Sequence, residues 1–146
     1  MALPKPEEGL VISYAYLWLH EFRVGREEGV KARPCAIIAS IRNDGDGKQR
    51  VRVVPITHLP PADLSVAIEI PQRVKQHLGL DDERSWVMLN ESNEFTWPGP
   101  DLRKIASHSD ERFDYGFLPP RFFENIRQAF LKLDKSRQAI RIKRTE

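Results

Sequence analysis

Residues 33–58, RPCAIIASIRNDGDGKQRVRVVPITH, carry the signal that decides the fold. The first part, Arg33–Ile41, has a continuous apolar middle, which is typical of a strand buried on both faces. Glycine and short polar residues at 43–48 tolerate positive φ and favour a hairpin loop. In residues 49–58 arginines alternate with valines, as in a strand with one solvent-facing side, until Pro55 breaks the ladder near the end. The segment therefore predicts a β-hairpin.

The residues before this hairpin predict one more strand and a long loop. Residues 10–18, LVISYAYLW, follow a glycine and are rich in β-branched and aromatic side chains, which favours a strand. The polar stretch 20–32, HEFRVGREEGVKA, contains two glycines and mixed charges, so we expect an exposed loop of a length that is often functional. Residues 1–8, MALPKPEE, lack the features of a signal peptide and are expected to form a flexible leader.

The residues after the hairpin predict short strands, one brief helix and a closing helix. VAIEIP at 66–71 predicts a strand, and PQRVKQHLGL at 71–80 predicts a helix with proline at its start and Gly79 at its stop. DDER at 81–84 is expected to be a loop. Residues 85–97 fit one bent strand or two short ones, and a further strand is expected near 102–106. Apolar residues at helical spacing predict an amphipathic closing helix over 119–140.

Together these elements predict a mainly β fold with a C-terminal α-helix. Many short strands without strand–helix alternation favour a small, partly open barrel over a parallel sheet. A length of 146 residues is typical of a single domain, so we expect one domain over residues 1–146.

The composition excludes few classes of function. Hydrophobic residues make up 40% and charged residues 30%, as in ordinary globular proteins. The net charge of +2 permits nucleic-acid binding but falls short of the strongly basic footprint of a dedicated binder. The single cysteine, Cys35, cannot form an internal disulfide, and no apolar run approaches the roughly 20 residues that span a bilayer. We therefore expect a cytoplasmic protein without membrane contact.

Three side chains of the hairpin are candidates for chemistry. The guanidinium of Arg33 could hold two oxygens of a phosphodiester and stabilise charge at a five-coordinate phosphorus, or it could simply pair with an acid at a strand edge. The Thr57 hydroxyl could bind a phosphate oxygen or orient an attacking 2′-hydroxyl, but threonine is too weak an acid to move protons unaided. His58 could act as a general acid or base. Strand alternation would point it away from Thr57, so only one of the two is expected to face Arg33, and we rank the threonine first.

The chain resembles the MazF/PemK toxins, small endoribonucleases built on an SH3-like β-barrel. The resemblance rests on a glycine-opened first strand, a polar loop ending in REEGVKARPCAIIAS, and VVPITH after the hairpin, and it is clearest over residues 9–57. In that family an arginine–proline pair opens the second strand, and a threonine ends a strand reading approximately PIT. The two side chains meet in the active site, so the resemblance implies that Arg33 and Thr57 are catalytic.

The resemblance also directs attention to the loop before Arg33, which the family uses to cover its substrate. His20 is a candidate proton carrier at the mouth of this loop. Glu27 and Glu28 resemble an acidic position of the family, although the spacing to Arg33 is one residue longer here. A second departure is Gly9-Leu10, where the family often has glycine followed by aspartate.

Basic and aromatic residues offer candidates for RNA contact. Arg23, Arg26 and Lys31 crowd the same loop and could track an RNA backbone, or they could belong to a solvated loop. Tryptophans in short strands more often belong to a core or a dimer interface, so we assign no RNA contact to Trp18, Trp86 or Trp97.

The function that the resemblance implies is metal-independent cleavage of single-stranded RNA by 2′-hydroxyl attack, which leaves a cyclic phosphate and a 5′-hydroxyl. Family members are toxins of type II toxin–antitoxin systems, act as homodimers and are inhibited by a cognate antitoxin. The sequence has no histidine or cysteine cluster with metal-ligand spacing, so we expect no metal and no cofactor. The alternatives are a barrel that only binds, like the CcdB toxins or an interaction module, and a nuclease-like protein that has lost its activity.

Overall fold

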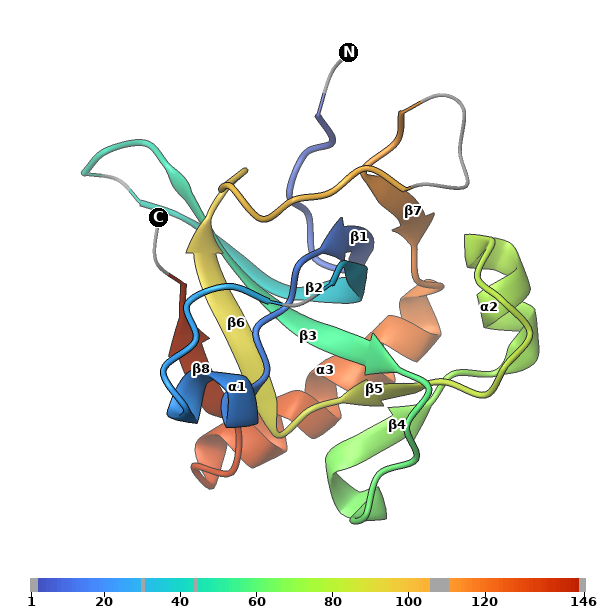
Figure 1. Cartoon of the computed structure of the whole chain (residues 1–146). Coiled ribbons are helices and arrows are strands. Elements are labelled where there is room, and N and C mark those ends of the chain that lie inside the picture. Colours follow the sequence, from blue (N-terminus) through green and yellow to red (C-terminus); the bar gives the residue numbers. More distant parts are fainter. Residues whose placement is uncertain (1–2, 30, 44, 106–110, 145–146) are drawn as a thin grey trace.

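The computed structural model describes residues 3–29, 31–43, 45–105 and 111–144, so Met1 and Ala2 of the expected leader lie outside the described residues. The chain is mainly β, with an eight-stranded, mostly antiparallel sheet and a C-terminal helix (Figure 1). The strands are β1 (Leu10–Tyr14), β2 (Arg33–Arg42), β3 (Gln49–Thr57), β4 (Ala67–Glu69), β5 (Trp86–Met88), β6 (Glu91–Thr96), β7 (Asp114–Phe117) and β8 (Ile140–Lys143). The helices are α1 (Leu19–Arg23), α2 (Gln72–Leu78) and α3 (Pro120–Lys135), and a 3-10 turn spans Leu64–Val66.

The strand order is β4-β5-β3-β2-β1-β7, with β6 paired to β3 and β8 paired to β6. The path of paired strands ends at β4 and β7, so the sheet is not closed into a ring. The mainly β class and the C-terminal helix are therefore confirmed, whereas the described strands form an open sheet.

The predicted hairpin of β2 and β3 is confirmed and lies inside the sheet. The two strands pair antiparallel, with Cys35 opposite Pro55. β3 also changes its second neighbour along its length: residues 50–53 pair with β6, whereas Ile56 and Thr57 pair with β5. Pro55 lies between these two ladders, at the point in the strand where a missing N–H disturbs the pairing least.

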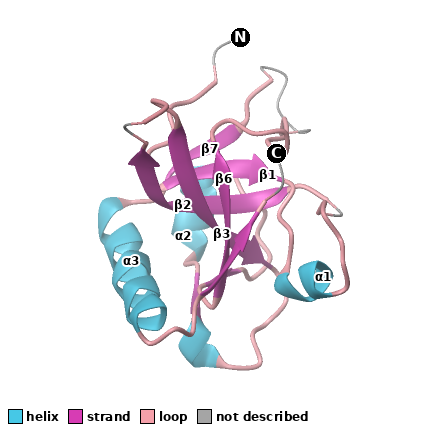
Figure 2. Ribbon diagram, turned by 90° about the vertical axis from the view of Figure 1, so that its left-hand side faces the viewer, coloured by secondary structure: helices cyan, strands magenta, loops and turns pink. Residues whose placement is uncertain are grey.

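Alternation along β2 divides its side chains between two hydrophobic clusters. Ala36 and Ile38 face the first cluster, which the strands share with α2 and α3, and Cys35 and Ile37 face the second. Burial on both faces, which the apolar run predicted, is confirmed. Figure 2 shows α3 and α1 on opposite sides of the strands. The middle of β2 is therefore covered, and its two ends are the more exposed parts.

Two expectations for residues 10–32 were wrong at their boundary. β1 ends at Tyr14 rather than at residue 18, and the segment expected to be loop from residue 20 begins with the helical turn α1. The buried carboxylate of Glu21 accepts the Trp18 N–H at 3.0 Å, which satisfies one of the free N–H groups at the start of a helix. Local hydrogen bonding thus overrides the strand preference of the aromatic residues.

The closing helix was predicted too long. α3 ends at Lys135, not at residue 140, and Arg137 adopts a φ of 61°. The N–H of Gln138 donates to the carbonyl of Leu133 at 2.7 Å, which completes the last turn. The chain then forms β8, which lies parallel to β6.

Two short strands, β7 and β8, were not predicted, and one predicted strand does not form. β7 pairs with β1 through a register shift, which hides its alternation in the sequence. The strand expected near residues 102–106 is reduced to an isolated bridge between Leu102 and Tyr14. Residue 106 lies outside the described part of the chain. The two strands expected within residues 85–97 are confirmed as β5 and β6.

Buried polar side chains of β6 hold the segment between β1 and α1. Asn93 accepts the N–H of Leu17 at 2.9 Å and donates to the carbonyl of the same residue at 2.8 Å. Glu91 accepts the N–H of Leu19 at 2.9 Å and the hydroxyl of Tyr16 at 3.0 Å. These bonds satisfy the backbone of a segment that is neither helix nor strand, and they fix the direction in which the chain enters α1.

The residue that follows β8 joins the same network. Arg144 is buried, and its guanidinium donates to the carbonyl of Ala15 at 2.8 Å and to the side chain of Asn93 at 3.1 Å. Its other terminal nitrogen lies 3.0 Å from the carboxylate of Asp101, which is also buried. A buried ion pair of this kind needs further hydrogen bonds to both groups. Here both terminal nitrogens of the guanidinium have partners, whereas its buried Nε has none among the described residues.

We predict that Asn93→Ala lowers the free energy of unfolding by roughly 2–4 kcal/mol, because two buried backbone groups lose their partner at about 1–3 kcal/mol each. Urea denaturation followed by circular dichroism measures the change. Asn125→Ala, the same substitution at an exposed position of α3, is the matched control and should change stability by less than about 0.5 kcal/mol. Equal effects of the two substitutions would contradict the anchoring role of Asn93.

Candidate functional site

The candidate site lies at the end of the hairpin away from its turn, where β2 begins at Arg33 and β3 ends at Thr57. The register pairs Cys35 with Pro55 and, continued by two residues, places Arg33 opposite Thr57. Both residues line two adjoining pockets of about 320 and 640 Å³. The antiparallel pairing therefore brings together the two residues that the resemblance singled out.

The two pockets differ in chemistry. The smaller one, called here the histidine pocket, contains His58, Asp81, Ser85 and Tyr115. The larger one, called here the tryptophan pocket, contains Trp18, His20, Met88 and the apolar stretch 59–62. Lys31, Arg33 and Thr57 line both pockets. The outer walls, residues 59–62 on one side and 79–85 on the other, both belong to the stretch between β3 and β5.

Arg33 is held by an aromatic ring rather than by an acid. Its guanidinium carbon lies 4.9 Å from the centroid of the Trp18 ring, within the range of a cation–π contact. Among the described residues it forms no ion pair, and its buried Nε has no hydrogen-bond partner. The alternative role of Arg33, an ion pair with an acid at the strand edge, is therefore not found among the described residues. The charge remains available to an anion that enters either pocket.

The Thr57 hydroxyl is oriented by the turn that follows β3. Its oxygen accepts the N–H of Leu59 at 3.1 Å. A hydroxyl that accepts in this way keeps its hydrogen, which can be donated to a ligand oxygen. Thr57 is thus suited to hydrogen-bond a phosphate beside Arg33.

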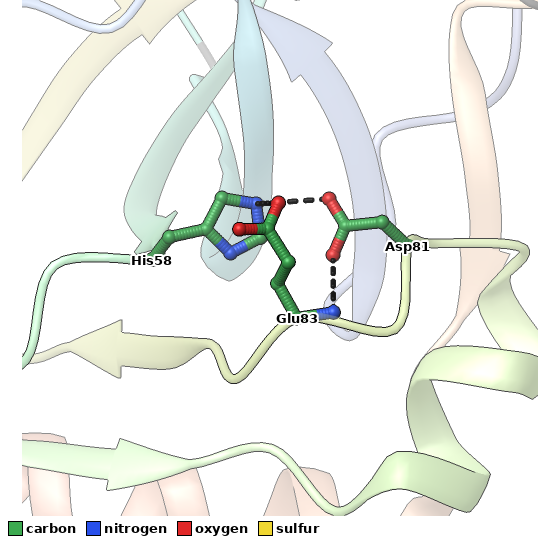
Figure 3. Close-up of side chains that lie close together, drawn as sticks. All are labelled: His58, Asp81 and Glu83. Carbon is green, nitrogen blue, oxygen red and sulfur yellow. Dashed lines mark hydrogen bonds and ion pairs between the residues drawn. The ribbon is translucent and has the colours of Figure 1, made fainter.

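His58 lines the same pocket as Thr57, so the expectation that strand alternation would separate the two was wrong. β3 ends at Thr57, and His58 belongs to the following turn, where the alternation of a strand no longer applies. Its Nε2 lies 2.9 Å from Oδ2 of Asp81 and 3.8 Å from Oε2 of Glu83. Figure 3 shows the imidazole beside these two carboxylates, which come from the loop after α2.

Asp81 is held in turn by a buried lysine. Lys75 on α2 is fully buried, and its ammonium lies 2.8 Å from Oδ1 of Asp81 and also donates to the carbonyl of Glu83. Partial burial would raise the pKa of Asp81, but the hydrogen bond from Lys75 and the nearby charge of His58 hold it below its ordinary value. The N–H of Glu83 also donates to Asp81, at 3.1 Å. Asp81 therefore lies between the ammonium of Lys75 and the imidazole of His58.

Both ring nitrogens of His58 face groups that accept hydrogen bonds. Nδ1 lies 3.0 Å from the carbonyl oxygen of Arg84, and Nε2 faces the carboxylate of Asp81 at 2.9 Å. A carbonyl and an ionised carboxylate can only accept, so this geometry is satisfied when both nitrogens carry a hydrogen.

Ser85, His58 and Asp81 contact one another in the order of a serine-hydrolase triad, with the Ser85 hydroxyl 3.0 Å from Nδ1. Nδ1 cannot take a proton from that hydroxyl, because the Arg84 carbonyl on the same nitrogen requires Nδ1 to be the donor. Ser85 is also buried and donates to the Glu83 carbonyl at 3.3 Å. We therefore assign no nucleophile to Ser85.

The nitrogen and oxygen ligand atoms of His58, Asp81 and Glu83 lie within 4.8 Å of one another, so these side chains could approach one metal ion. However, two ligands of a tetrahedral ion at about 2.0–2.2 Å lie roughly 3.3 Å apart or more, whereas Nε2 and Oδ2 are 2.9 Å apart. The ammonium of Lys75 next to Asp81 also opposes a second cation. The geometry fits a shared proton better than a metal ion.

The remaining predicted residues divide into two groups. His20 on α1 lines the tryptophan pocket, and its ring stacks near that of Trp18 with centroids 6.4 Å apart. Lys31 lines both pockets. The others are exposed and line neither pocket: Arg23, Arg26, Glu27 and Glu28.

Sequence reasoning missed three residues of the site. Trp18 was left to a core or interface, but it lies under Arg33 because β1 ends four residues earlier than predicted. Asp81 was placed in a loop without a role. Lys75 gave the one usable signal, because it lies on the apolar face of α2 beside Val74 and Leu78, where an unpaired lysine would be costly.

Comparison of the chain with protein-family models, curated proteins and solved structures finds no match. Within the described ranges, none of the helices has the length and apolar character needed to cross a bilayer.

We predict that Asp81→Asn lowers the free energy of unfolding by roughly 1–2 kcal/mol at neutral pH, because Lys75 loses its charged partner. The pKa of Asp81 is lower in the folded chain than its ordinary value of 3.8, so this contribution is present above pH 3.8 and is lost as the pH falls through the folded-state value. Urea titrations over that range should show wild type and variant converging in acid. Asp82→Asn, at the neighbouring exposed aspartate, is the matched control, and an equal loss there would refute the role of Asp81.

Proposed function

We propose that this protein is an endoribonuclease that cleaves single-stranded RNA without a metal ion, on a small SH3-like barrel of the MazF/PemK kind. The observation that carries the proposal is the pair Arg33 and Thr57 at the junction of the two pockets, with a guanidinium that no described acid neutralises. An arginine stacked on a ring and open to solvent-filled space is suited to bind a phosphodiester.

The reaction follows from the chemistry of these two side chains. The 2′-hydroxyl of the nucleotide attacks the adjacent phosphorus, the bond to the 5′-oxygen breaks, and a cyclic phosphate and a 5′-hydroxyl are left. Arg33 binds non-bridging oxygens and stabilises the charge that grows on them in the transition state. The Thr57 hydroxyl donates to the same phosphate and holds it in line.

The tryptophan pocket supports an unpaired nucleic acid as the substrate. Trp18 and His20 lie roughly parallel there, and the apolar stretch 59–62 forms the opposite wall. Such a surface binds the flat face of a base that is not stacked in a duplex. Lys31, at the rim of both pockets, would contact the backbone phosphates.

The biological role that we propose also follows from the resemblance to the MazF/PemK toxins. We propose that the protein is a toxin of a type II toxin–antitoxin system, acts in the cytoplasm as a homodimer and is inhibited by a cognate antitoxin that occupies the RNA site. No cofactor takes part in the proposed reaction. The expected leader and the single-domain organisation belong to this proposal.

One observation favours a second candidate function. The tryptophan pocket is lined by Leu59, Pro60, Pro61, Ala62 and Met88, an apolar set that also suits a segment of another protein. A barrel that only binds, in the manner of the CcdB toxins, would use this pocket and would have no need of Arg33 and Thr57 facing a phosphate.

We predict that the purified protein cuts a mixed single-stranded RNA pool in the presence of EDTA and leaves cyclic phosphate and 5′-hydroxyl ends. Arg33→Ala should slow cleavage roughly 100- to 1,000-fold, the usual loss of one transition-state donor, and Thr57→Val should slow it about 10- to 100-fold. RNA with 2′-O-methyl groups should stay intact. Gel analysis of end-labelled RNA measures each rate.

Arg42→Ala is the matched control, because Arg42 is an exposed arginine at the other end of β2. Its cleavage rate should equal that of wild type. Absence of cleavage by folded wild type would reject the ribonuclease and leave the binding module. Cleavage that EDTA abolishes would reject the metal-free reaction.

A further inference from the structure

A second basic surface lies at the turn end of the hairpin, away from the candidate site. β6 pairs with β3 on one side and with β8 on the other, and Figure 1 shows β8 beside β6. The register sets Glu94 of β6 opposite Arg52 of β3 and opposite Lys143 of β8. Residues that lie directly opposite each other, or two apart in one strand, share a face of the sheet. One face therefore carries four cations from two strands: Arg50, Arg52, Arg141 and Lys143.

This face is hollowed by two adjoining pockets of about 300 and 380 Å³, which share Arg52 and Arg141. The second pocket also contains Asp134, from the last turn of α3, and Arg137, which follows the helix. The five cations at this place are called here the arginine face: Arg50, Arg52, Arg137, Arg141 and Lys143.

Glu94 holds two of these arginines from below. Its carboxylate lies 2.8 Å from Arg50 and 3.1 Å from Arg141. The side chain of Glu94 is 13% exposed, whereas those of the two arginines are 42% and 48% exposed. Burial would raise the pKa of Glu94, but the hydrogen bond from Arg50 and the charges of Arg141 and Lys143 hold it below its ordinary value. The acid is thus shielded, and the guanidinium groups face solvent.

The other contacts fix Arg52 and leave two cations without an acid. Asp134 lies 3.1 Å from Arg52, whose guanidinium also lies 4.8 Å from the centroid of the Phe130 ring. Among the described residues, no acid forms an ion pair with Arg137 or Lys143. The two carboxylates that contact the face therefore neutralise two of its five cations. The excess of three charges is larger than the net charge of +2 of the whole chain, so positive charge is concentrated here.

We infer that the arginine face is a second RNA-binding surface, which holds the backbone of the substrate outside the cleavage site; the identity of the ligand rests on the proposed function. Each guanidinium has five N–H donors in a planar fork that matches phosphate oxygens, so an arginine that already contacts one carboxylate can still bind a phosphate. Cations two residues apart on a strand lie about 7 Å apart. They repeat along the face as phosphates repeat along an extended nucleic-acid strand.

Apolar side chains beside the cations favour a single strand over a duplex. Ile41 is 68% exposed and lines the first pocket, and Ile140 is 40% exposed and lines the second. Unpaired bases offer flat apolar surfaces, which a duplex hides in its stack. A single-stranded RNA therefore meets both chemistries of this face, with its phosphates on the arginines and its bases on the isoleucines.

The length of the hairpin separates the two RNA surfaces. β2 has ten residues, so its ends lie about 30 Å apart. A tetranucleotide, at about 3.4 Å per stacked nucleotide, does not span this distance. The arginine face thus contributes to binding only when the RNA extends well beyond the bond that is cut.

The test compares a 20-nucleotide single-stranded RNA with a tetranucleotide that contains the bond cut by wild type. The triple variant Arg137→Gln, Arg141→Gln and Lys143→Gln removes three charges and leaves Glu94 its pair with Arg50. It should cut the tetranucleotide at the wild-type rate and have the wild-type midpoint in urea. It should bind the long RNA, labelled with fluorescein and carrying 2′-O-methyl groups, roughly 10- to 100-fold more weakly at 0.1 M salt.

Fluorescence anisotropy at several salt concentrations measures this binding. The slope of log Kd against log salt should be smaller by about 2 in the triple variant, because each phosphate contact to a single strand contributes about 0.7. The matched control is a second triple variant, Lys5→Gln, Arg73→Gln and Arg121→Gln, which removes the same charge from exposed positions that line neither pocket of the face. It should bind the long RNA as wild type does.

Three results would overturn the inference while the proposed function stands. An equal loss of binding in both triple variants would show a general effect of net charge. No loss in either would show that the arginine face does not bind RNA. Displacement of the labelled RNA by poly-glutamate as readily as by unlabelled RNA would identify an acidic peptide as the ligand.

Cleavage and binding are measured separately. If wild type cuts neither RNA, the proposed function fails. The binding series with 2′-O-methyl RNA, which the reaction cannot cut, then still decides whether the arginine face binds RNA.

Discussion

The pairing of β2 with β3 is the constraint on which the site depends. Its register sets the first residue of one strand against the last residue of the other, so Arg33 and Thr57 meet although they are far apart in the sequence. The middle of the hairpin is buried on both faces, which fixes the register, since a slip by one residue would exchange the two faces of each strand. The stability of the core thus determines the geometry at its exposed end.

A second constraint acts from β6. Glu91 and Asn93 are buried polar residues in a strand that could have been apolar, and they hold the segment that leads to Trp18. The cost of burying them is offset by the hydrogen bonds of Oε1 of Glu91 and of both amide atoms of Asn93. The ring beneath Arg33 is therefore placed by contacts from a distant strand, and no acid within the described ranges forms an ion pair with the guanidinium.

The sequence predicted the elements correctly where the spacing of apolar residues or a local motif determines the structure. The apolar run of β2, the alternation in β3 and the proline and glycine that bound α2 all led to the observed elements. The sequence was uninformative where a contact between distant residues decides. β8 forms because it can pair with β6, and α1 forms where Glu21 accepts the Trp18 N–H, and neither leaves a periodic pattern.

The same division applies to the site. The family resemblance implied that Arg33 and Thr57 lie together, and the pairing of β2 with β3 brings both to the same end of the hairpin. The link from His58 to Asp81 and Lys75 could not be predicted, since it joins the end of β3 to a loop and a helix that follow much later. Lys75, on the apolar face of α2, could have signalled a polar partner nearby, but not which residue.

Both pocket walls that face Arg33 and Thr57 belong to the stretch between β3 and β5, whereas the two residues themselves belong to the hairpin core. Arg33 and Thr57 are thus placed by the hairpin, whereas residues 59–62, which line the tryptophan pocket with them, follow it. Substitutions in residues 59–62 can alter what enters the tryptophan pocket without changing the pairing of β2 with β3. The residues that shape the entrance to this pocket and the residues that set the hairpin register therefore lie in different segments.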